Sequence, residues 1–159
     1  MGPRELELLH VAAVVVFLGN LLTSLHWAAR AGQTRDLNIV AHTFEQLRNA
    51  DLWFTIPGTI VLLLAGIATG LGAADSVLGT GWILWGIGFF GIALTILATV
   101  RAGLQRDLHE FARSESAEQA SWKEFDFMYR YWRSWTIGAI VAALVAVFMM
   151  IYRPSLPAF

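Results

Sequence analysis

Few side chains inside the apolar stretches of this sequence are able to do chemistry. His10 lies about one turn into the first apolar stretch, and Asn20 lies near its middle. A polar group is costly to place inside lipid, which makes each one a candidate functional residue. A neutral imidazole among the apolar side chains of a helix bundle is a common ligand of b-type haem. His10 is therefore a candidate axial ligand and Asn20 a candidate cofactor contact. The alternative for His10 is a hydrogen bond to a neighbour at the level of the lipid headgroups.

A haem at His10 has several arrangements open to it. No second histidine of an apolar stretch lies at the same depth, which argues against a bis-histidine cytochrome within one chain. A five-coordinate haem, a methionine ligand from Met149 or Met150, and a ligand from a second copy of the chain all stay open.

The remaining histidines are weak candidates for a metal site. His10 and His26 are 16 residues apart, which is ~24 Å along one helix, so they cannot bind the same ion. His26, His42 and His109 converge only if the first loop folds under the third apolar stretch, and their spacing lacks a His-x-x-x-His pattern. No carboxylate or lysine lies well inside an apolar stretch, which argues against an ion-coupled pump.

Four apolar stretches, separated by three polar loops, must position these residues. They cover residues 6–29, 52–72, 82–100 and 135–152. Each is about twenty residues long, enough for an α-helix to cross a hydrocarbon core ~30 Å thick. Only helices and closed barrels satisfy their backbone polar groups inside lipid, and these stretches lack the alternation of barrel strands. The sequence therefore predicts an all-α bundle of four transmembrane helices.

Two of the helices are expected to continue beyond the membrane. Leu104, Leu108 and Phe111 fall at i, i+4 and i+7, so helix three extends past the bilayer. Ser121 and Glu124 have the spacing of a capping box that opens the last helix. The expected helices cover about 6–29, 52–72, 82–112 and 121–152, in a single integral membrane domain over residues 1–159.

Composition excludes several classes of protein. The chain is 57% hydrophobic and 14% charged, whereas a soluble domain averages about 25% charged residues. Four spans use most of its 159 residues, so no separate soluble catalytic domain fits. A net charge of −1 argues against a nucleic-acid partner. The absence of cysteine excludes disulfides, thiolate nucleophiles and iron–sulfur clusters.

Arginine and lysine are concentrated in the first and third loops. Nine of the eleven lie there, at Arg30, Arg35, Arg48, Arg101, Arg106, Arg113, Lys123, Arg130 and Arg133. Cytoplasmic loops carry an excess of these residues. The first and third loops are therefore predicted to be cytoplasmic, with both termini outside.

Two residues near the start of the second apolar stretch have expected structural roles. Asp51 directly precedes it, where a carboxylate caps free backbone amides. The functional alternative for Asp51 is a proton or cation contact at the mouth of the bundle. Pro57 lies one turn further on and removes an amide hydrogen, which predicts a kink.

Small residues recur at four-residue steps on two of the helices. Gly66 and Gly70 form a GxxxG pair in the second span, and Gly138 and Ala142 share a face of the last span. Small residues let helices approach closely in lipid. These faces either close the bundle internally or build a homo-oligomer or a larger membrane complex.

Several segments together give the chain a family resemblance. They are Leu9-His10-Val11, Phe17-Leu18-Gly19-Asn20, Trp27, Asp51-Leu52-Trp53-Phe54-Thr55-Ile56-Pro57-Gly58 and Gly81-Trp82-Ile83-Leu84. Over most of its length the chain resembles a bacterial family of predicted four-helix integral membrane proteins of unknown function. The resemblance implies this fold and a location in the bacterial cytoplasmic (inner) membrane, and it brings no established activity.

The His-Val pair near the start of helix one is more remotely similar to two other small membrane families. These are the copper-resistance D-like proteins and the bacterial membrane protoporphyrinogen oxidase, which place a histidine of helix one at a haem. This similarity implies that His10 is an axial ligand of haem b. The oxidase family also uses a lysine on helix three, where this sequence has none.

Two classes of function follow from these observations. The first is a non-enzymatic accessory, scaffold or small-molecule-binding protein, favoured by the scarcity of polar groups in the spans and by the small-residue faces. The second is a haem-b membrane protein with redox or oxidase activity, favoured by His10. A transport role is the third candidate, in which Asn20, Asp51 and Pro57 line a path through the bundle. It ranks last because no inverted repeat relates the two halves of the chain.

Overall fold

The computed structural model describes residues 2–73, 79–114 and 122–157, and almost all of these are helical. Within them, four helices are long and apolar enough to cross a membrane, which confirms the predicted all-α architecture. The first is α1 (Pro3–Thr34) and the last is α6 (Trp122–Tyr152). The second consists of α2 (Leu37–Ala50), the π-helical turn η1 (Asp51–Thr55) and α3 (Ile56–Ala73). The third consists of α4 (Gly81–Ile96), the π-helical turn η2 (Leu97–Arg101) and α5 (Ala102–Arg113).

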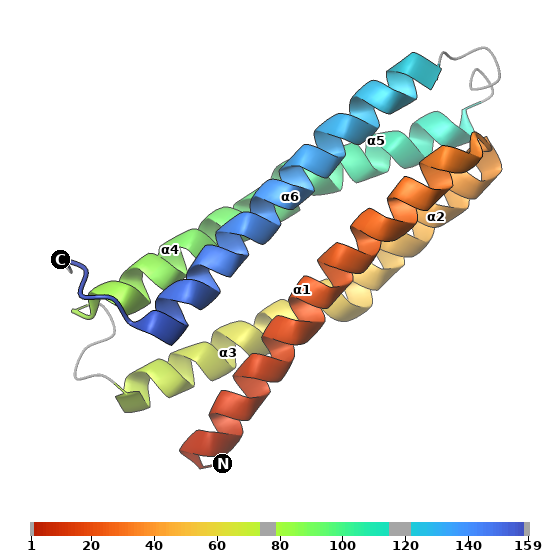
Figure 1. The fold of residues 1–159 in the computed structure, drawn as a ribbon. Coiled ribbons are helices and arrows are strands. Elements are labelled where there is room, and N and C mark those ends of the chain that lie inside the picture. Colours follow the sequence, from red (N-terminus) through yellow and green to blue (C-terminus); the bar gives the residue numbers. More distant parts are fainter. Residues whose placement is uncertain (1, 74–78, 115–121, 158–159) are drawn as a thin grey trace.

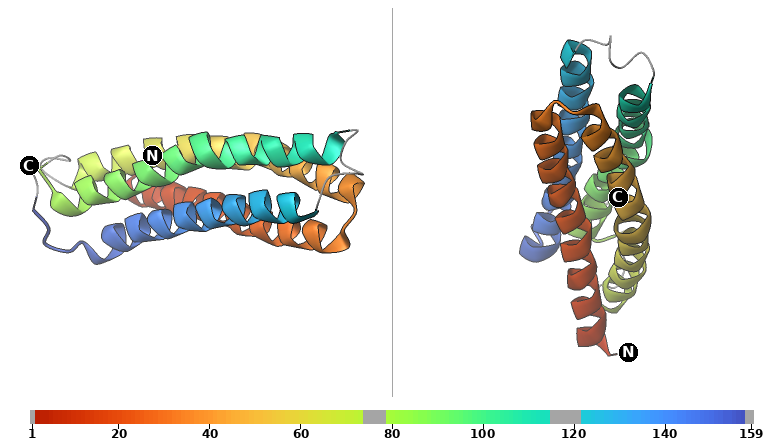
Figure 2. Two further views of the ribbon diagram at one scale, coloured as in Figure 1. Left: turned by 90° about the horizontal axis from the view of Figure 1, so that it is seen from above. Right: turned by 90° about the vertical axis from the view of Figure 1, so that its right-hand side faces the viewer.

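The four long helices run antiparallel. Both termini lie at the end of the bundle where α3 ends and α4 begins (Figure 1). Seen from above, α1 and α6 form one layer, and the other two long helices form the second (Figure 2).

Helix two begins earlier than hydropathy indicated, at Leu37. Asp36 is its N-cap, and its carboxylate accepts hydrogen bonds from the amides of Asn38 at 2.8 Å and Ile39 at 3.3 Å. Arg35 adopts φ = 53°, which ends α1 and reverses the chain. The expected first loop is therefore a two-residue turn, flanked by helices on both sides.

The segment over residues 37–50, which its polarity predicts to be a loop, is helical. It is an amphipathic helix, in which Val40, Phe44 and Leu47 are buried at helical spacing. Helix one likewise continues beyond residue 29, to Thr34. Ser121, which was expected to cap the last helix, lies outside the described residues.

Asp51 lies inside a helix, so the expectation that it caps helix two is wrong. It opens η1, in which the amide of Ile56 donates to the carbonyl oxygen of Asp51, five residues back. Pro57 follows directly. The irregularity expected from its missing amide takes the form of this π-helical turn.

Helices two and three change their main packing partner at the two π-helical turns. On the side of the termini, α3 packs on α1 and α4 packs on α6 (Figure 1). On the other side, α2 packs on α5, which joins the two pairs. We call the part with the termini the membrane half, because its α3 and α4 have 18 and 16 residues. These are ~27 Å and ~24 Å long, close to the thickness of the hydrocarbon core. The other part is the polar half.

Each half has its own hydrophobic core. The core of the membrane half is built from aliphatic and aromatic side chains that include Phe17, Leu21, Leu62, Phe90, Leu97 and Ile140. The core of the polar half includes Val40, Phe44, Leu47, Leu108, Phe125 and Trp132. In this second core the rings of Phe44 and Trp132 meet edge to face, with their centroids 5.5 Å apart.

Candidate functional site

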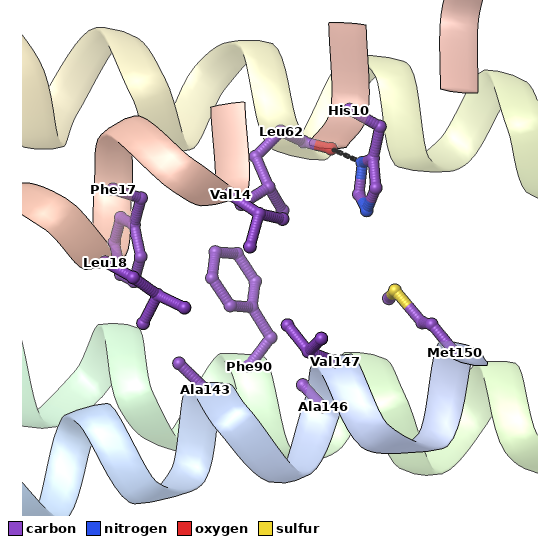
Figure 3. A pocket seen from close by; sticks show the side chains of 10 residues that line it. All are labelled: His10, Val14, Phe17, Leu18, Leu62, Phe90, Ala143, Ala146, Val147 and Met150. Atoms are coloured by element: carbon purple, nitrogen blue, oxygen red, sulfur yellow. Dashed lines mark hydrogen bonds between the residues drawn. The ribbon is translucent and has the colours of Figure 1, made fainter. Parts of the chain in front are cut away.

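A small cavity lies in the membrane half, between the α1–α3 and α4–α6 pairs (Figure 3). It is lined by His10, Val14, Phe17, Leu18, Leu62, Phe90, Ala143, Ala146, Val147 and Met150. All four long helices contribute, and His10 supplies the polar side chain. The volume is about 20 Å³, which is room for about one water molecule.

The imidazole of His10 has a fixed orientation. Its Nδ1 lies 3.0 Å from the carbonyl oxygen of Leu62. A carbonyl can only accept, so Nδ1 carries a proton, and in the neutral imidazole Nε2 keeps its lone pair. The ring rests on Gly66, where a Cβ atom would lie 2.9 Å from Cε1 of His10. Gly66 is therefore the residue that allows the ring to approach α3.

The second nitrogen of His10 is directed into the cavity. Nε2 has no hydrogen-bond partner among the described residues, and Met150 lies on the opposite side of the cavity (Figure 3). A histidine held through one nitrogen by a carbonyl, with the other free, has the arrangement of metal-ligating histidines. His10 has the chemistry of a ligand and of a hydrogen-bond acceptor for a bound molecule.

The fit to haem is incomplete in this arrangement of the helices. Histidine and methionine are both axial ligands of haem iron, so the donor set is suitable. Pockets for organic ligands have volumes of roughly 300–1,000 Å³, whereas this cavity has about 20 Å³. A porphyrin requires the two helix pairs to separate.

A second candidate site lies at the π-helical turns. Each of the four long helices places two polar residues there, four positions apart, which puts both on one face. These eight residues, which we call the polar layer, are Asn20 and Ser24, Asp51 and Thr55, Arg101 and Gln105, and Trp132 and Thr136. The lengths of α3 and α4, which separate the polar layer from the end with the termini, predict that this layer lies near one edge of the hydrocarbon core.

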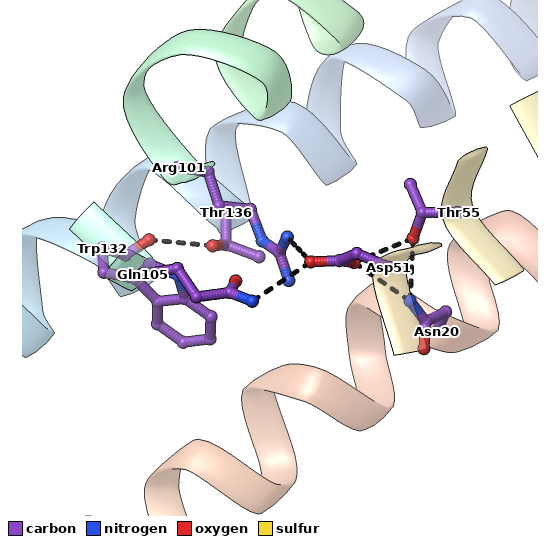
Figure 4. Close-up of polar contacts among 7 residues, drawn as sticks. All are labelled: Asn20, Asp51, Thr55, Arg101, Gln105, Trp132 and Thr136. Atoms are coloured by element: carbon purple, nitrogen blue, oxygen red, sulfur yellow. Dashed lines mark hydrogen bonds and ion pairs between the residues drawn. The ribbon is translucent and has the colours of Figure 1, made fainter. Parts of the chain in front are cut away.

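The carboxylate of Asp51 joins the two sides of the polar layer (Figure 4). Its Oδ2 accepts from Nη1 of Arg101 at 2.5 Å and from Nε2 of Gln105 at 3.3 Å. Its Oδ1 accepts from Nδ2 of Asn20 at 3.2 Å and from Oγ1 of Thr55 at 2.9 Å. The first two residues belong to helix three, and the last two belong to helices one and two. One carboxylate therefore connects three of the long helices.

Arg101 is buried deeply for a cation. Its side chain is 3% exposed and that of Asp51 is 19% exposed, and its guanidinium lies 5.5 Å from the ring centroid of Trp132. Several buried atoms of the polar layer lack a hydrogen-bond partner among the described residues: Oγ of Ser24, Nε and Nη2 of Arg101, Oε1 of Gln105 and Nε1 of Trp132. Groups of this kind are the ones that bind ordered water in protein interiors.

The structure separates the residues that were expected to form one site. Asn20 lies ten residues beyond His10 on α1, which is ~15 Å, and it belongs to the polar layer. His26 and His42 are exposed and His109 is half-buried. Within the described part of the chain, no three histidine or carboxylate side chains come together to hold a metal ion.

The small residues have different surroundings. Gly66 contacts His10, and Ala142 is buried in the core of the membrane half, so both face the interior. A Cβ atom on Gly138 would meet nothing within 4 Å. Gly70 is half-buried near the end of α3.

Reasoning from sequence missed the partners of Asp51. Arg101 is counted among the basic residues of the third loop, and Gln105 falls within the helix expected over residues 82–112, with no site role expected for either. Their four-residue spacing within each helix was visible. Their convergence required knowledge of which helix faces which.

The comparison with protein families agrees with this architecture. A family model described as "Predicted integral membrane protein (DUF2269)" matches residues 5–154. The chain belongs to this family. The match covers every residue of the cavity and of the polar layer, and it confirms the family resemblance inferred from the sequence. No curated protein and no solved structure matches the chain. The similarity to the copper-resistance and oxidase families stays a prediction.

Proposed function

We propose that this integral membrane protein binds a small, largely apolar molecule within the bilayer and serves as a non-enzymatic accessory protein for it. The binding site is the cavity between the α1–α3 and α4–α6 pairs. One observation carries the proposal: His10 presents a free Nε2 to an otherwise apolar cavity.

The surroundings of His10 support a binding role over simple anchoring at the headgroups. A histidine that only anchors a helix would need neither a fixed tautomer nor a glycine beneath its ring. Here the carbonyl of Leu62 sets the tautomer, and Gly66 provides the space. A polar group in an apolar pocket commonly fixes the orientation of a ligand.

Haem b, with redox or oxidase activity, is the second candidate. The bond between Nδ1 of His10 and the carbonyl of Leu62 favours it, because such bonds orient metal-ligating histidines. A bound haem would supply one-electron chemistry. His10 would hold it and Leu62 would fix the ring, provided that the helix pairs move apart to admit it.

Native mass spectrometry of the protein in lipid nanodiscs tests the binding role. The variants are His10→Ala and the control His26→Ala, which changes an exposed histidine of the same helix. We expect a bound small molecule in the wild type and in the control, and its loss in His10→Ala. A wild type that carries only phospholipid, or a bound mass that His10→Ala retains, contradicts the proposal.

An optical spectrum separates the two candidates. Oxidised and dithionite-reduced spectra of the same variants, purified from haem-replete cells, show whether the bound molecule is haem. A Soret band that His10→Ala loses assigns haem b. A colourless protein with a bound mass assigns a different apolar molecule.

We also propose that the protein resides in the bacterial cytoplasmic (inner) membrane with its polar half in the cytoplasm. The placement of nine of the eleven basic residues on that side supports this orientation. Homo-oligomerisation through the open face at Gly138 is consistent with close packing of small residues in lipid. Light scattering of the detergent complex measures the mass, and a monomer would contradict the oligomer.

A further inference from the structure

Different forces hold the two halves of the bundle closed. In the polar half, separation of the helices would expose Phe44, Phe125 and Trp132 to water, which the hydrophobic effect opposes. In the membrane half, the pairs meet through apolar side chains such as Phe17 and Phe90, whose ring centroids are 5.6 Å apart. Separation there replaces protein contacts with lipid contacts, and lipid tails are as apolar as leucine. The membrane half is therefore the easier one to open.

The polar layer lies at the boundary between these two halves. Asp51 opens η1 in the second helix, and Arg101 closes η2 in the third, so the ion pair connects the two π-helical turns. A π-helical turn interrupts the regular hydrogen-bond ladder and is often found at functional sites. At these points helix two passes from packing mainly on α5 to packing on α1, and helix three from packing mainly on α2 to packing on α6.

The ion pair directly connects helices two and three in the layer, but the network around it is incomplete. Nε and Nη2 of Arg101 and Oε1 of Gln105 have no partner in the described part of the chain. A partly satisfied buried network stabilises less than a complete one. The layer thus holds the pairs together without locking them.

We propose that the α1–α3 and α4–α6 pairs swing apart about the polar layer, with the Asp51–Arg101 ion pair as the latch. This motion opens the cavity at His10 sideways to the bilayer. The inference rests on the proposed function for what enters: an apolar molecule dissolved in lipid. Lateral opening supplies the space that the closed cavity, at about 20 Å³, does not have.

Distance measurement by double electron–electron resonance tests the motion. The chain has no cysteine, so spin labels go only where cysteines are introduced. Ile67→Cys on α3 and Ile87→Cys on α4 report on the membrane half, and both positions are exposed. Glu45→Cys on α2 and Asp107→Cys on α5 report on the polar half, again at exposed positions.

Each label pair is combined with Asp51→Asn and with a control, Asp126→Asn. The control removes the exposed 2.8 Å ion pair between Asp126 and Arg35. We expect Asp51→Asn to give a longer and broader distance distribution in the membrane half and no change in the polar half. The control leaves both distributions unchanged. An unchanged membrane half in Asp51→Asn overturns the proposal.

A milder variant guards against unfolding. Gln105→Leu removes one donor to Asp51 and keeps the ion pair, so it should shift the membrane-half distance in the same direction by less. If neither label pair gives a defined distance distribution in Gln105→Leu, the proposal is also overturned. The polar layer would then stabilise the whole fold. The labels need no ligand. If Asp51→Asn opens the membrane half but the wild type binds no small molecule, the latch is supported and the proposed function is rejected.

Discussion

Gly66 sets the position of His10. A Cβ atom there would lie 2.9 Å from Cε1 and 3.1 Å from Nδ1 of the imidazole, closer than ordinary contact. The ring would have to move away from α3 and lose its bond to the carbonyl of Leu62. A residue that looked like part of a helix-packing motif therefore shapes the candidate ligand site.

Substitution of this glycine gives a prediction at the scale of residues. Alanine stabilises a helix interior by ~1 kcal/mol relative to glycine. At Gly138, where a Cβ atom meets nothing within one copy of the chain, we expect Gly138→Ala to leave the monomer equally stable or to stabilise it by up to that amount. Gly66→Ala should instead destabilise the protein, by on the order of 1 kcal/mol, through loss of the hydrogen bond and crowding of the ring.

Unfolding in mixed detergent micelles measures both free energies. Wild type and the two variants are compared under the same conditions. Equal stability of Gly66→Ala and Gly138→Ala would show that the imidazole moves aside without cost, against this account.

At the scale of elements, the N-cap of helix two is Asp36 rather than the expected Asp51. Asp51 looked like a helix cap and is instead the centre of a buried network. Asp36, inside what looked like a loop, is the cap of α2. The difference arises because α2 is amphipathic. Its burial becomes evident only when α1 and α5 are packed against it.

Removal of the cap at Asp36 gives a prediction for this element. Loss of an N-cap side chain costs ~1 kcal/mol in typical proteins. We expect Asp36→Ala to lower the free energy of unfolding by about that amount. Asp36→Ser, which keeps a capping oxygen, should retain most of it. Hydrogen exchange of the first amides of α2 reads the same change locally, and unaltered exchange in Asp36→Ala would argue against the cap.

At the scale of the whole molecule, the chain divides into one half matched to the hydrocarbon core and one half with a separate aromatic core. The polar layer separates them and carries the ion pair that connects the helix pairs. Burial of such a pair is not in itself a large source of stability, because desolvation offsets the attraction. A pair with a small net contribution can separate and re-form at little cost, which suits a latch, whereas removal of one partner leaves an uncompensated charge.

The orientation of the two halves gives a prediction at this scale. Ser155→Cys lies at the end with the termini, and Glu45→Cys lies on α2 in the polar half, both at exposed positions. In intact cells, a membrane-impermeant maleimide should label Ser155→Cys and spare Glu45→Cys. After permeabilisation both should react. Labelling of Glu45→Cys in intact cells would reverse the proposed topology.

Several features were determined by the sequence alone. Four spans and an all-α fold follow from apolar stretches of sufficient length, which is a property of consecutive residues. His10 was recognisable as a candidate because a polar side chain inside an apolar stretch needs no partner to be noticed.

Tertiary structure decided everything that depends on residues far apart in the chain. Asp51 and Arg101 are fifty positions apart, and their contact exists because the π-helical turns of two helices face one another. Gly66 and His10 meet because α3 packs on α1. Hydropathy describes the environment of each residue along one dimension. The pairing of helices, which brings these side chains together, is a property of the three-dimensional structure.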